Sequence, residues 1–240
     1  MNADKLSKRL ETVVSFIPEG SRIADIGSDH AYLPCYAVDK GIAVSGIAGE
    51  VAEGPYQSAV KQVKYSLLED VISVRKGDGL EVLNQNEADC ITIAGMGGAL
   101  IASILENGKD KLGGVSRLIL QPNVGAAAIR KWLFENGWEL KAEKILEEDN
   151  KIYEILAADR GNPKTPYNQF EREFLLGPFL LKENSPVFQQ KWEQELKQWR
   201  NIIEKMKEAG DSPGLRERKA QVLKKIDIVE EVFDEKGKRT

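Results

Sequence analysis

Histidine and cysteine are the scarcest residues that could bind a metal in this sequence of 240 residues. There is one histidine, His30, and there are two cysteines, Cys35 and Cys90, without the C-x-x-C spacing of a metal or redox motif. Zinc sites and disulfide frameworks need clusters of such residues, so we expect neither, and we expect no bound metal. Unpaired cysteines are typical of a reducing compartment, which predicts a cytoplasmic location.

Long apolar runs are also absent. No stretch approaches the roughly 18 to 20 apolar residues that a membrane span requires. The opening segment MNADKLSKRLETVVSFIP mixes charged and apolar residues and lacks the apolar core of a signal peptide. We therefore expect a soluble protein without a membrane partner.

A positive excess is missing as well, because 34 lysines and arginines face 38 aspartates and glutamates. The total charge of −4 therefore does not by itself indicate a nucleic-acid-binding protein. The charges are unevenly distributed, however, with 18 basic against 24 acidic residues in 1–160 and 16 against 14 in 161–240. We expect phosphate contacts from the basic segment RERKAQVLKK at 216–225 and from Lys5, Lys8 and Arg9. A basic run can also be a solvated helix face.

Short apolar segments alternate with amphipathic ones through the first part of the chain. They predict strands at 22–26, 43–48, 71–75, 89–94 and 117–121, and helices near 4–16, 31–40, 54–67, 98–107 and 124–136. Such β-α repetition indicates a doubly wound parallel sheet covered on both faces. The segment 138–160 then predicts a hairpin of two longer strands. A terminal hairpin is expected of the α/β class I (Rossmann-like) methyltransferase fold and not of the standard dinucleotide-binding fold.

The pattern becomes purely helical after the segment GNPKTP at 161–166, which predicts a linker. Apolar residues then recur at helical spacing on either side of a turn at 209–214: Phe188, Trp192, Leu196, Trp199, Ile203 and Met206 before it, and Leu215, Val222, Ile226, Val229 and Phe233 after it. Two such helices predict a C-terminal antiparallel coiled-coil hairpin. We therefore expect an α/β domain at 1–160 and a helical domain at 161–240.

A polar or glycine-rich cluster follows each of the five predicted parallel strands. The clusters are 25–30, 49–50, 77–79, 94–98 and 121–123. In open α/β sheets the ligand binds outside the carboxyl ends of the strands, near the point where the strand order reverses. We therefore expect these clusters to form one ligand site.

The charges of these clusters narrow the choice of ligand. Asp29 would repel the pyrophosphate that a dinucleotide presents to the first loop. S-adenosylmethionine has no phosphate and carries a sulfonium and an ammonium group, which carboxylates attract. Glu50 would accept hydrogen bonds from the ribose hydroxyls and Asp78 from the adenine amino group, while the glycines at 95–98 would let the backbone approach the cofactor. The pattern favours S-adenosylmethionine over NAD.

His30 has two interpretations. As a base for a serine nucleophile it would act on Ser28, but no G-x-S-x-G elbow surrounds that serine. We expect His30 to be a loop residue that bonds the backbone or forms a wall of the cofactor site. A direct role in the reaction is the alternative.

Five segments in this order and spacing resemble the TrmK family of bacterial tRNA methyltransferases: ADIGSDHAYLPCYAV, GIAGEV, RKGDGLEVL, ADCITIAGMGGALI and LILQPN. The likeness extends over essentially the whole chain. It implies a class I methyltransferase domain with a C-terminal coiled-coil hairpin and tRNA as the partner. It also implies methylation of N1 of the adenosine at position 22 of tRNA with S-adenosylmethionine.

The resemblance also implies which residues bind the cofactor. They are Asp25, Gly27, Asp29, His30, Glu50, Asp78, Gly79, Gly95 and Met96. Ser28, Ala94 and Gly97 belong to the same strand-end clusters and complete the predicted cofactor site.

The fourth strand ends in Ala-Gly-Met-Gly-Gly rather than in the Asn-Pro-Pro-aromatic motif of amino-directed adenine methyltransferases, which disfavours methylation of an amine. Adenine N1 has a free lone pair, so its attack on a methyl group requires no obligatory general base. We predict that Asn123 orients the base, with Asp29 and His30 on the same rim. Asn123 could instead cap a helix that begins at Val124. A small-molecule methyltransferase and a non-catalytic RNA-binding protein stay open as alternatives, and we expect a monomer.

Overall fold

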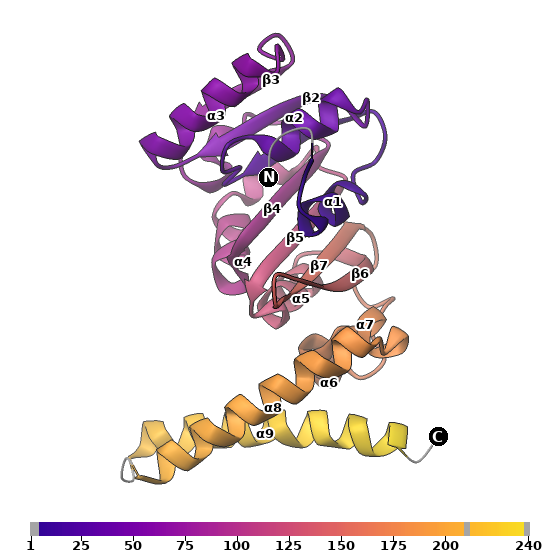
Figure 1. Cartoon of the computed structure of the whole chain (residues 1–240). Coiled ribbons are helices and arrows are strands. Elements are labelled where there is room, and N and C mark those ends of the chain that lie inside the picture. The colour runs from indigo at the N-terminus through magenta and orange to yellow at the C-terminus, as the bar shows by residue number, and fades with distance from the viewer. Residues whose placement is uncertain (1–4, 209–211, 238–240) are drawn as a thin grey trace. The chain divides into compact units, whose positions relative to one another are not determined.

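The computed structural model of the chain describes residues 5–208 and 212–237 (Figure 1). The chain divides into two compact units, Met1–Asn168 and Gln169–Thr240. The division falls shortly after the predicted linker at 161–166, whose residues form turns.

The first unit is built on a seven-stranded sheet with the order β3-β2-β1-β4-β5-β7-β6. The strands are β1 (Ser21–Ile26), β2 (Ala43–Glu50), β3 (Ile72–Lys76), β4 (Cys90–Gly97), β5 (Arg117–Val124), β6 (Trp138–Glu148) and β7 (Lys151–Arg160). Strands β1 to β5 are parallel, whereas β7 runs antiparallel to β5 and to β6. The strand order reverses beside β1, which has β2 on one side and β4 on the other. The predicted class I methyltransferase fold with its terminal hairpin is confirmed.

Helices connect the parallel strands, as the amphipathic segments predict. They are α1 (Lys8–Val14), α2 (Tyr32–Asp39), α3 (Glu53–Tyr65), α4 (Gly98–Asn107) and α5 (Ala126–Glu135), with short 3-10 helices η1 (Gly79–Val82) and η2 (Lys109–Leu112). Helix α1 is shorter than the predicted segment 4–16, of which residue 4 lies outside the described range. Helices α4 and α5 pack against each other and against β5.

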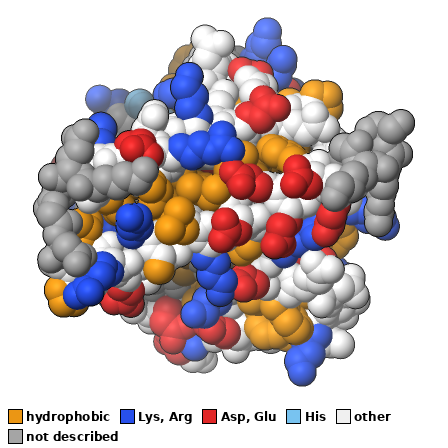
Figure 2. Space-filling model, turned by 90° about the horizontal axis from the view of Figure 1, so that it is seen from below, with side chains coloured by type: hydrophobic (Ala, Val, Ile, Leu, Met, Phe, Trp, Pro, Cys, Tyr) orange, Lys and Arg blue, Asp and Glu red, His pale blue; other side chains and the backbone are white. Residues whose placement is uncertain are grey.

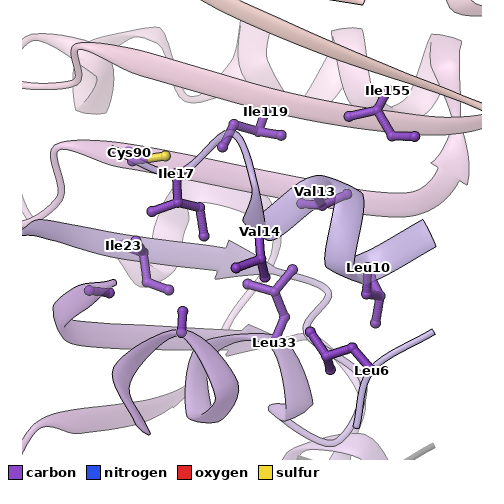
Figure 3. Close-up of a cluster of buried hydrophobic side chains, with 12 residues drawn as sticks. Leu6, Leu10, Val13, Val14, Ile17, Ile23, Leu33, Cys90, Ile119 and Ile155 are labelled. Carbon is purple, nitrogen blue, oxygen red and sulfur yellow. The ribbon is translucent and has the colours of Figure 1, made fainter. Parts of the chain in front are cut away.

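One face of the sheet is covered by α1 and α2. Figure 3 shows Leu10, Val13 and Val14 of α1 together with the strand residues Ile23 and Ile119, with which they form one buried cluster. Cys90 and Ile155 belong to the same cluster and mark the same face on β4 and β7. Because strand side chains alternate between faces, the residues two positions after Ile23, Cys90 and Ile119, and two positions before Ile155 in antiparallel β7, also lie on this face. They are Asp25, Thr92, Gln121 and Tyr153, so the apolar core changes to a polar layer toward one edge of the sheet.

A buried charge cluster ties the terminal hairpin to α5. The guanidinium of Arg130 is completely buried and forms ion pairs with Glu143 of β6 and Glu154 of β7. Removing one partner of a buried ion pair leaves an uncompensated charge and costs roughly 3–5 kcal/mol. The three residues therefore fix how α5 and the hairpin pack.

The second unit is helical and consists of α6 (Phe170–Leu176), α7 (Pro178–Glu183), α8 (Pro186–Glu208) and α9 (Pro213–Gly237) among the described residues. Helices α8 and α9 pack against each other as a hairpin (Figure 1). The predicted apolar stripe is buried or half-buried, and Val232 joins it. Residues 209–211 of the predicted turn lie outside the described residues.

Candidate active site

The carboxyl ends of β1, β4 and β5 meet at a pocket with a volume of about 370 Å³. Residues of helix α1 and strand β7 also line it. The pocket is lined by Arg9, Leu10, Asp25, Gly27, Ser28, Asp29, Leu33, Ala94, Gly95, Met96, Asn123 and Tyr153. The structure thus brings three of the five predicted strand-end clusters into one cavity.

Asp25 lies at the bottom of this pocket and is almost completely buried. Its carboxylate accepts hydrogen bonds from the hydroxyls of Ser28 and Thr92, each at 2.6 Å. Burial raises the pKa of Asp25 above its usual value of 3.8, while the two hydroxyl donors and the charge of Arg9 act in the opposite direction. A cationic ligand would add to the charge of Arg9 in favouring the ionised carboxylate.

The loop after β1 has an unusual backbone. Gly27, Asp29, His30 and Ala31 all have positive φ angles, of 69°, 40°, 74° and 55°. Non-glycine residues in this region each carry strain of order 1–3 kcal/mol, which persists only where surrounding contacts enforce it. One such contact is visible, because the backbone N–H of Asp29 donates to the carboxylate of Glu50.

His30 and Asp29 lie at the outer part of this loop. The His30 ring stacks on Tyr32 with a centroid distance of 5.2 Å, and its Nε2 lies 3.6 Å from a carboxylate oxygen of Asp29. The Asp29 side chain is 77% exposed, and Asp29 lines the pocket whereas His30 does not. Ser28 Oγ donates to Asp25, so the serine is engaged in holding the loop.

Glu50 ends β2 and is also buried. Burial raises the pKa of its carboxyl above 4.5, the hydrogen bond from Asp29 lowers it, and the charges of Asp25 and Asp29 raise it again. Only one carboxylate oxygen has a donor within residues 5–208 and 212–237, which leaves the other able to accept from a ligand hydroxyl. One oxygen of the Glu50 carboxylate is therefore held by the Asp29 N–H, and the other can accept a hydrogen bond from a ligand.

Asp78 and Gly79 do not line the pocket. They follow β3, beside the end of β2, where the Gly77 N–H donates to the Glu50 carbonyl at 2.9 Å. The Asp78 side chain is exposed. The structure thus places these two residues next to Glu50, on the side of β1 opposite to β4.

The glycine-rich end of β4, residues 94–97, pairs irregularly with β5, and we call this segment the β4 loop. The Gly95 N–H donates to Gln121 Oε1 at 3.0 Å, and Asn123 Nδ2 donates to the Gly95 carbonyl at 2.6 Å. A Cβ atom on Gly27 would lie 2.2 Å from the Met96 methyl group, so the first loop and this loop approach closely. Gly97 does not line the pocket, whereas Ala94, Gly95 and Met96 do.

Asn123 does not cap a helix. Strand β5 continues to Val124, and the N-cap of α5 is Gly125, whose φ of 76° is in the left-handed region. The capping alternative for Asn123 is therefore wrong. The side chain of Asn123 instead holds the β4 loop, and its Nδ2 donation to Gly95 leaves Oδ1 as an acceptor.

Arg9 and Tyr153 were not predicted as pocket residues. The Arg9 guanidinium donates to Gln121 Oε1 and lies 5.3 Å from the centroid of the Tyr153 ring. From the sequence we expect Arg9 to contact RNA phosphates, but the structure places it in the pocket. The polar alternation on β4 and β5 could have indicated Thr92 and Gln121, whereas no local signal marks Arg9 or Tyr153.

Helix α1 is fixed over the pocket by contacts that are remote in sequence. Ser7 caps its first turn, and the Glu148 carboxylate accepts from the backbone N–H groups of Lys8 at 2.7 Å and Arg9 at 3.2 Å. The buried side chains of Leu10, Val13 and Val14 anchor the other face of the helix. Arg9 is thereby aimed at the pocket.

Three further observations bear on the chemistry. Burial raises the pKa of Cys35 to about 11 and that of Cys90 to about 12, so neither is a thiolate nucleophile at neutral pH. Among the described residues, no three His, Cys, Asp or Glu side chains are grouped as a metal site would require. No described helix is long and apolar enough to cross a membrane.

Comparisons with known proteins identify the family. The family model described as "TrmK: tRNA (adenine(22)-N(1))-methyltransferase" matches residues 23–231. A tRNA (adenine(22)-N(1))-methyltransferase of Bacillus subtilis (strain 168) is 52% identical over 236 residues, which cover 98% of this chain and 99% of the relative.

Solved structures agree with this relationship. The crystal structure of the B. subtilis m1A22 tRNA methyltransferase TrmK superposes with a TM-score of 0.90 at 51% identity, covering 95% of this chain and 98% of that chain. The Streptococcus pneumoniae protein Sp1610, in complex with S-adenosyl-L-methionine, gives 0.81 at 46% identity, with 95% and 99% covered. The resemblance stated from the sequence motifs is confirmed: the chain belongs to the TrmK family of tRNA (adenine(22)-N(1))-methyltransferases.

Proposed function

We propose that this protein transfers a methyl group from S-adenosylmethionine to N1 of the adenosine at position 22 of tRNA. The observation that carries the proposal is the pocket at the ends of β1, β4 and β5, which is lined by residues predicted to bind the cofactor and to orient the base. The 52% identity to the B. subtilis enzyme over nearly the whole length of both chains supports the same activity.

The pocket fits S-adenosylmethionine by its charges. Asp25 and Asp29 present carboxylates to a ligand that carries a sulfonium and an ammonium group. The open oxygen of Glu50 suits a ribose hydroxyl. A Cβ atom on Gly97 would meet no atom within 4 Å, and one on Gly95 would meet only Arg9, so the β4 loop leaves bare backbone for close approach.

We assign the parts of the cofactor to groups of residues. The methionine end would be held by the first loop and the β4 loop: Asp25, Gly27, Ser28, Asp29, Ala94, Gly95, Met96 and Gly97. The ribose and adenine would lie toward Glu50, Asp78 and Gly79, which lie on the far side of β1 from the pocket's β5 wall. His30 would form part of the wall between the two. When bound, the cofactor supplies an electrophilic methyl group on sulfur.

The residues of this chain would position the acceptor base and not deprotonate it. Adenine N1 carries a lone pair at neutral pH, so placement and electrostatics account for the catalysis. Asn123 is held by Gly95 with its Oδ1 left as an acceptor, which suits the adenine amino group next to N1. Guanine presents a carbonyl oxygen at the corresponding position and would be rejected. Asp29, which also lines the pocket, would lie on the same rim, with His30 next to it.

We further propose that residues 161–240 form the tRNA-contacting domain and that 1–160 form the cofactor-binding domain. In the basic run of α9, Lys224 pairs with Glu171 and Lys225 lies over Trp199, whereas Arg218 is exposed. Figure 2 shows acidic, basic and apolar side chains interspersed on the face it presents. Contacts with RNA phosphates would therefore be local rather than spread over a uniformly basic surface.

Both cysteines are free and buried, as suits the reducing cytoplasm where tRNA is modified.

The test is a methylation assay with unmodified tRNA, followed by mass spectrometry of the product nucleosides. We expect 1-methyladenosine from tRNA with adenosine at position 22 and none from the same tRNA with guanosine there. The Asn123→Ala variant should lower kcat/KM by about 10-fold or more, because a hydrogen bond to the base is lost. The proposal would be overturned if the tRNA with guanosine at position 22 gave product. It would also be overturned if the enzyme methylated a small molecule at the full rate in the absence of tRNA.

A further inference from the structure

Arg9 is the only cationic side chain among the described residues that line the pocket. The anionic side chains in the same lining are Asp25 and Asp29. Arg9 is half-buried, whereas Lys5 and Lys8 beside it are exposed. A guanidinium is unexpected in a pocket that we assign to a cationic ligand, because like charges repel.

The contacts of Arg9 leave most of its donors available. One Nη1–H donates to Gln121 Oε1, which also accepts the Gly95 N–H, and the guanidinium lies near the Tyr153 ring. Within residues 5–208 and 212–237 the guanidinium has no second acceptor. Nη1 would lie 3.8 Å from a Cβ atom placed on Gly95, so the group sits next to the bare backbone of the β4 loop.

Gln121 fixes this arrangement from inside the protein. Its side chain is completely buried, and its amide oxygen joins the guanidinium to the β4 loop. The buried Nε2 of the same amide has no partner in the described structure. Gln121 thus holds the Arg9 guanidinium in place before a ligand binds. A ligand oxygen beside Arg9 could accept from it without any rearrangement of the side chain.

The charges of the pocket are the inverse of those of one end of S-adenosylmethionine. The lining offers one cation and two carboxylates, and the methionine end of the cofactor offers one carboxylate and two cations. We propose that Arg9 binds the carboxylate of the methionine moiety of S-adenosylmethionine, an inference that rests on the cofactor assigned under the proposed function. Planar guanidinium groups hold carboxylates through paired hydrogen bonds.

Arg9 would therefore compensate the negative charge of the ligand carboxylate. Without it, the ligand carboxylate would lie in a pocket whose other charges are Asp25 and Asp29, and like charges repel strongly in partly screened surroundings. The other source of an oxyanion is a phosphate of the tRNA. The carboxylate is favoured because Arg9 is tied to the β4 loop inside the pocket, away from the exposed Lys5 and Lys8.

The experiment compares two ligands by isothermal titration calorimetry with the full chain. The ligands are S-adenosylmethionine and its decarboxylated analogue, which lacks only the carboxylate. We expect Arg9→Gln to weaken S-adenosylmethionine binding by about 10- to 100-fold, as for the loss of a charged hydrogen bond. The analogue should bind the unmodified chain weakly and lose less than about threefold in the variant, since its missing group is the one that Arg9 contacts.

Two further variants keep the result interpretable. Arg9→Lys retains the charge but not the planar fork, so an intermediate loss with S-adenosylmethionine is expected, and this variant decides if Arg9→Gln does not fold. Lys64→Gln removes one positive charge from an exposed site on α3 and should leave both affinities unchanged. Thermal unfolding of each variant checks its folding.

Equal losses for both ligands in Arg9→Gln would overturn the proposal and give Arg9 a purely structural role. Unchanged S-adenosylmethionine binding together with weaker, less salt-dependent tRNA binding would overturn it in favour of a phosphate contact. If the unmodified chain binds S-adenosylmethionine but does not methylate tRNA, the proposed acceptor is wrong, and the comparison of the two ligands still decides the role of Arg9.

Discussion

Asp25 is a carboxylate placed where ionisation is unfavourable. Its neighbours Ser28 and Thr92 donate hydrogen bonds, but burial outweighs them and raises its pKa. A group whose pKa is raised in the folded state stabilises the fold most at a pH below its unfolded value, here 3.8, and that contribution is lost as the pH rises through the folded pKa. A bound cation would add to the charge of Arg9 in favouring the ionised form of this carboxylate.

We predict that S-adenosylmethionine binds more tightly as the pH rises from the acidic range to neutrality. The cationic ligand favours the ionised form of Asp25, and that of Glu50, whose pKa is also raised, so binding releases protons. Calorimetry in buffers of different ionisation enthalpy would measure this release.

The Asp25→Asn variant is the control for this pH dependence, because its amide cannot ionise. It should bind the cofactor about 10- to 100-fold more weakly at neutral pH and with a flatter pH profile. The unliganded variant should be at least as stable as the unmodified protein at neutral pH, since the buried charge is gone. A variant with the same steep pH profile as the unmodified chain would contradict the assignment to Asp25.

At the residue scale, the sequence predicted the parts of the site that follow from strand geometry. Asp25, Gly95 and Asn123 come together because parallel strands end at one edge of a sheet. Arg9 and Tyr153 could not be predicted in this way. Their place depends on the docking of α1 onto the terminal hairpin through Glu148, a contact across about 140 positions of the chain.

At the scale of elements, the start of α4 depends on a close approach of two backbones. A Cβ atom on Gly98, the first residue of α4, would lie 2.1 Å from the carbonyl oxygen of Gly125. Backbone atoms cannot rotate away as a flexible side chain can. The β4–α4 and β5–α5 connections are therefore held together at the edge of the pocket.

We predict that Gly98→Ala destabilises the protein by about 1–3 kcal/mol, as overpacking does. Gly113→Ala at the C-cap of η2 is the matched control, because Gly113 already has helical backbone angles (φ −58°, ψ −40°) and a Cβ atom there meets nothing within 4 Å. Alanine favours a helix over glycine, so this control should be neutral or slightly stabilising. Urea unfolding would measure both, and a neutral Gly98→Ala would show that the two loops separate easily.

Element positions were predicted well where periodicity is strong, and less well at boundaries. The predicted helix at 98–107 coincides with α4, whereas a helix predicted from residue 124 begins at Ala126. The difference arises because β5 pairs with β4 as far as Val124, and Gly125 then turns the chain with a positive φ. Pairing between strands, which local sequence does not reveal, sets this boundary.

At the scale of the whole molecule, the two compact units predict a division of labour. A chain that ends at Asn168 should bind S-adenosylmethionine as the full chain does, because every residue that lines the pocket precedes that point. Its affinity for tRNA should fall by about tenfold or more and depend less on salt, since phosphate contacts are lost. Filter binding over a salt series would measure this.

Charge reversal of Arg218 and Lys219 in the full chain is the companion to this truncation. It should weaken tRNA binding in the same direction while leaving cofactor binding intact. Unchanged tRNA binding and methylation by the shortened chain would contradict a tRNA-contacting role for the helical unit.

The pocket wall formed by Arg9 and Tyr153 also has a consequence for synthesis on the ribosome. One side of the cavity comes from the beginning of the chain and the other from β7, and Glu148 is needed to secure α1 between them. A nascent chain that has completed all five parallel strands still has an open cavity. The cofactor site is therefore complete only after the terminal hairpin has emerged. Cofactor binding would then stabilise the first unit once it has folded and would not guide its folding.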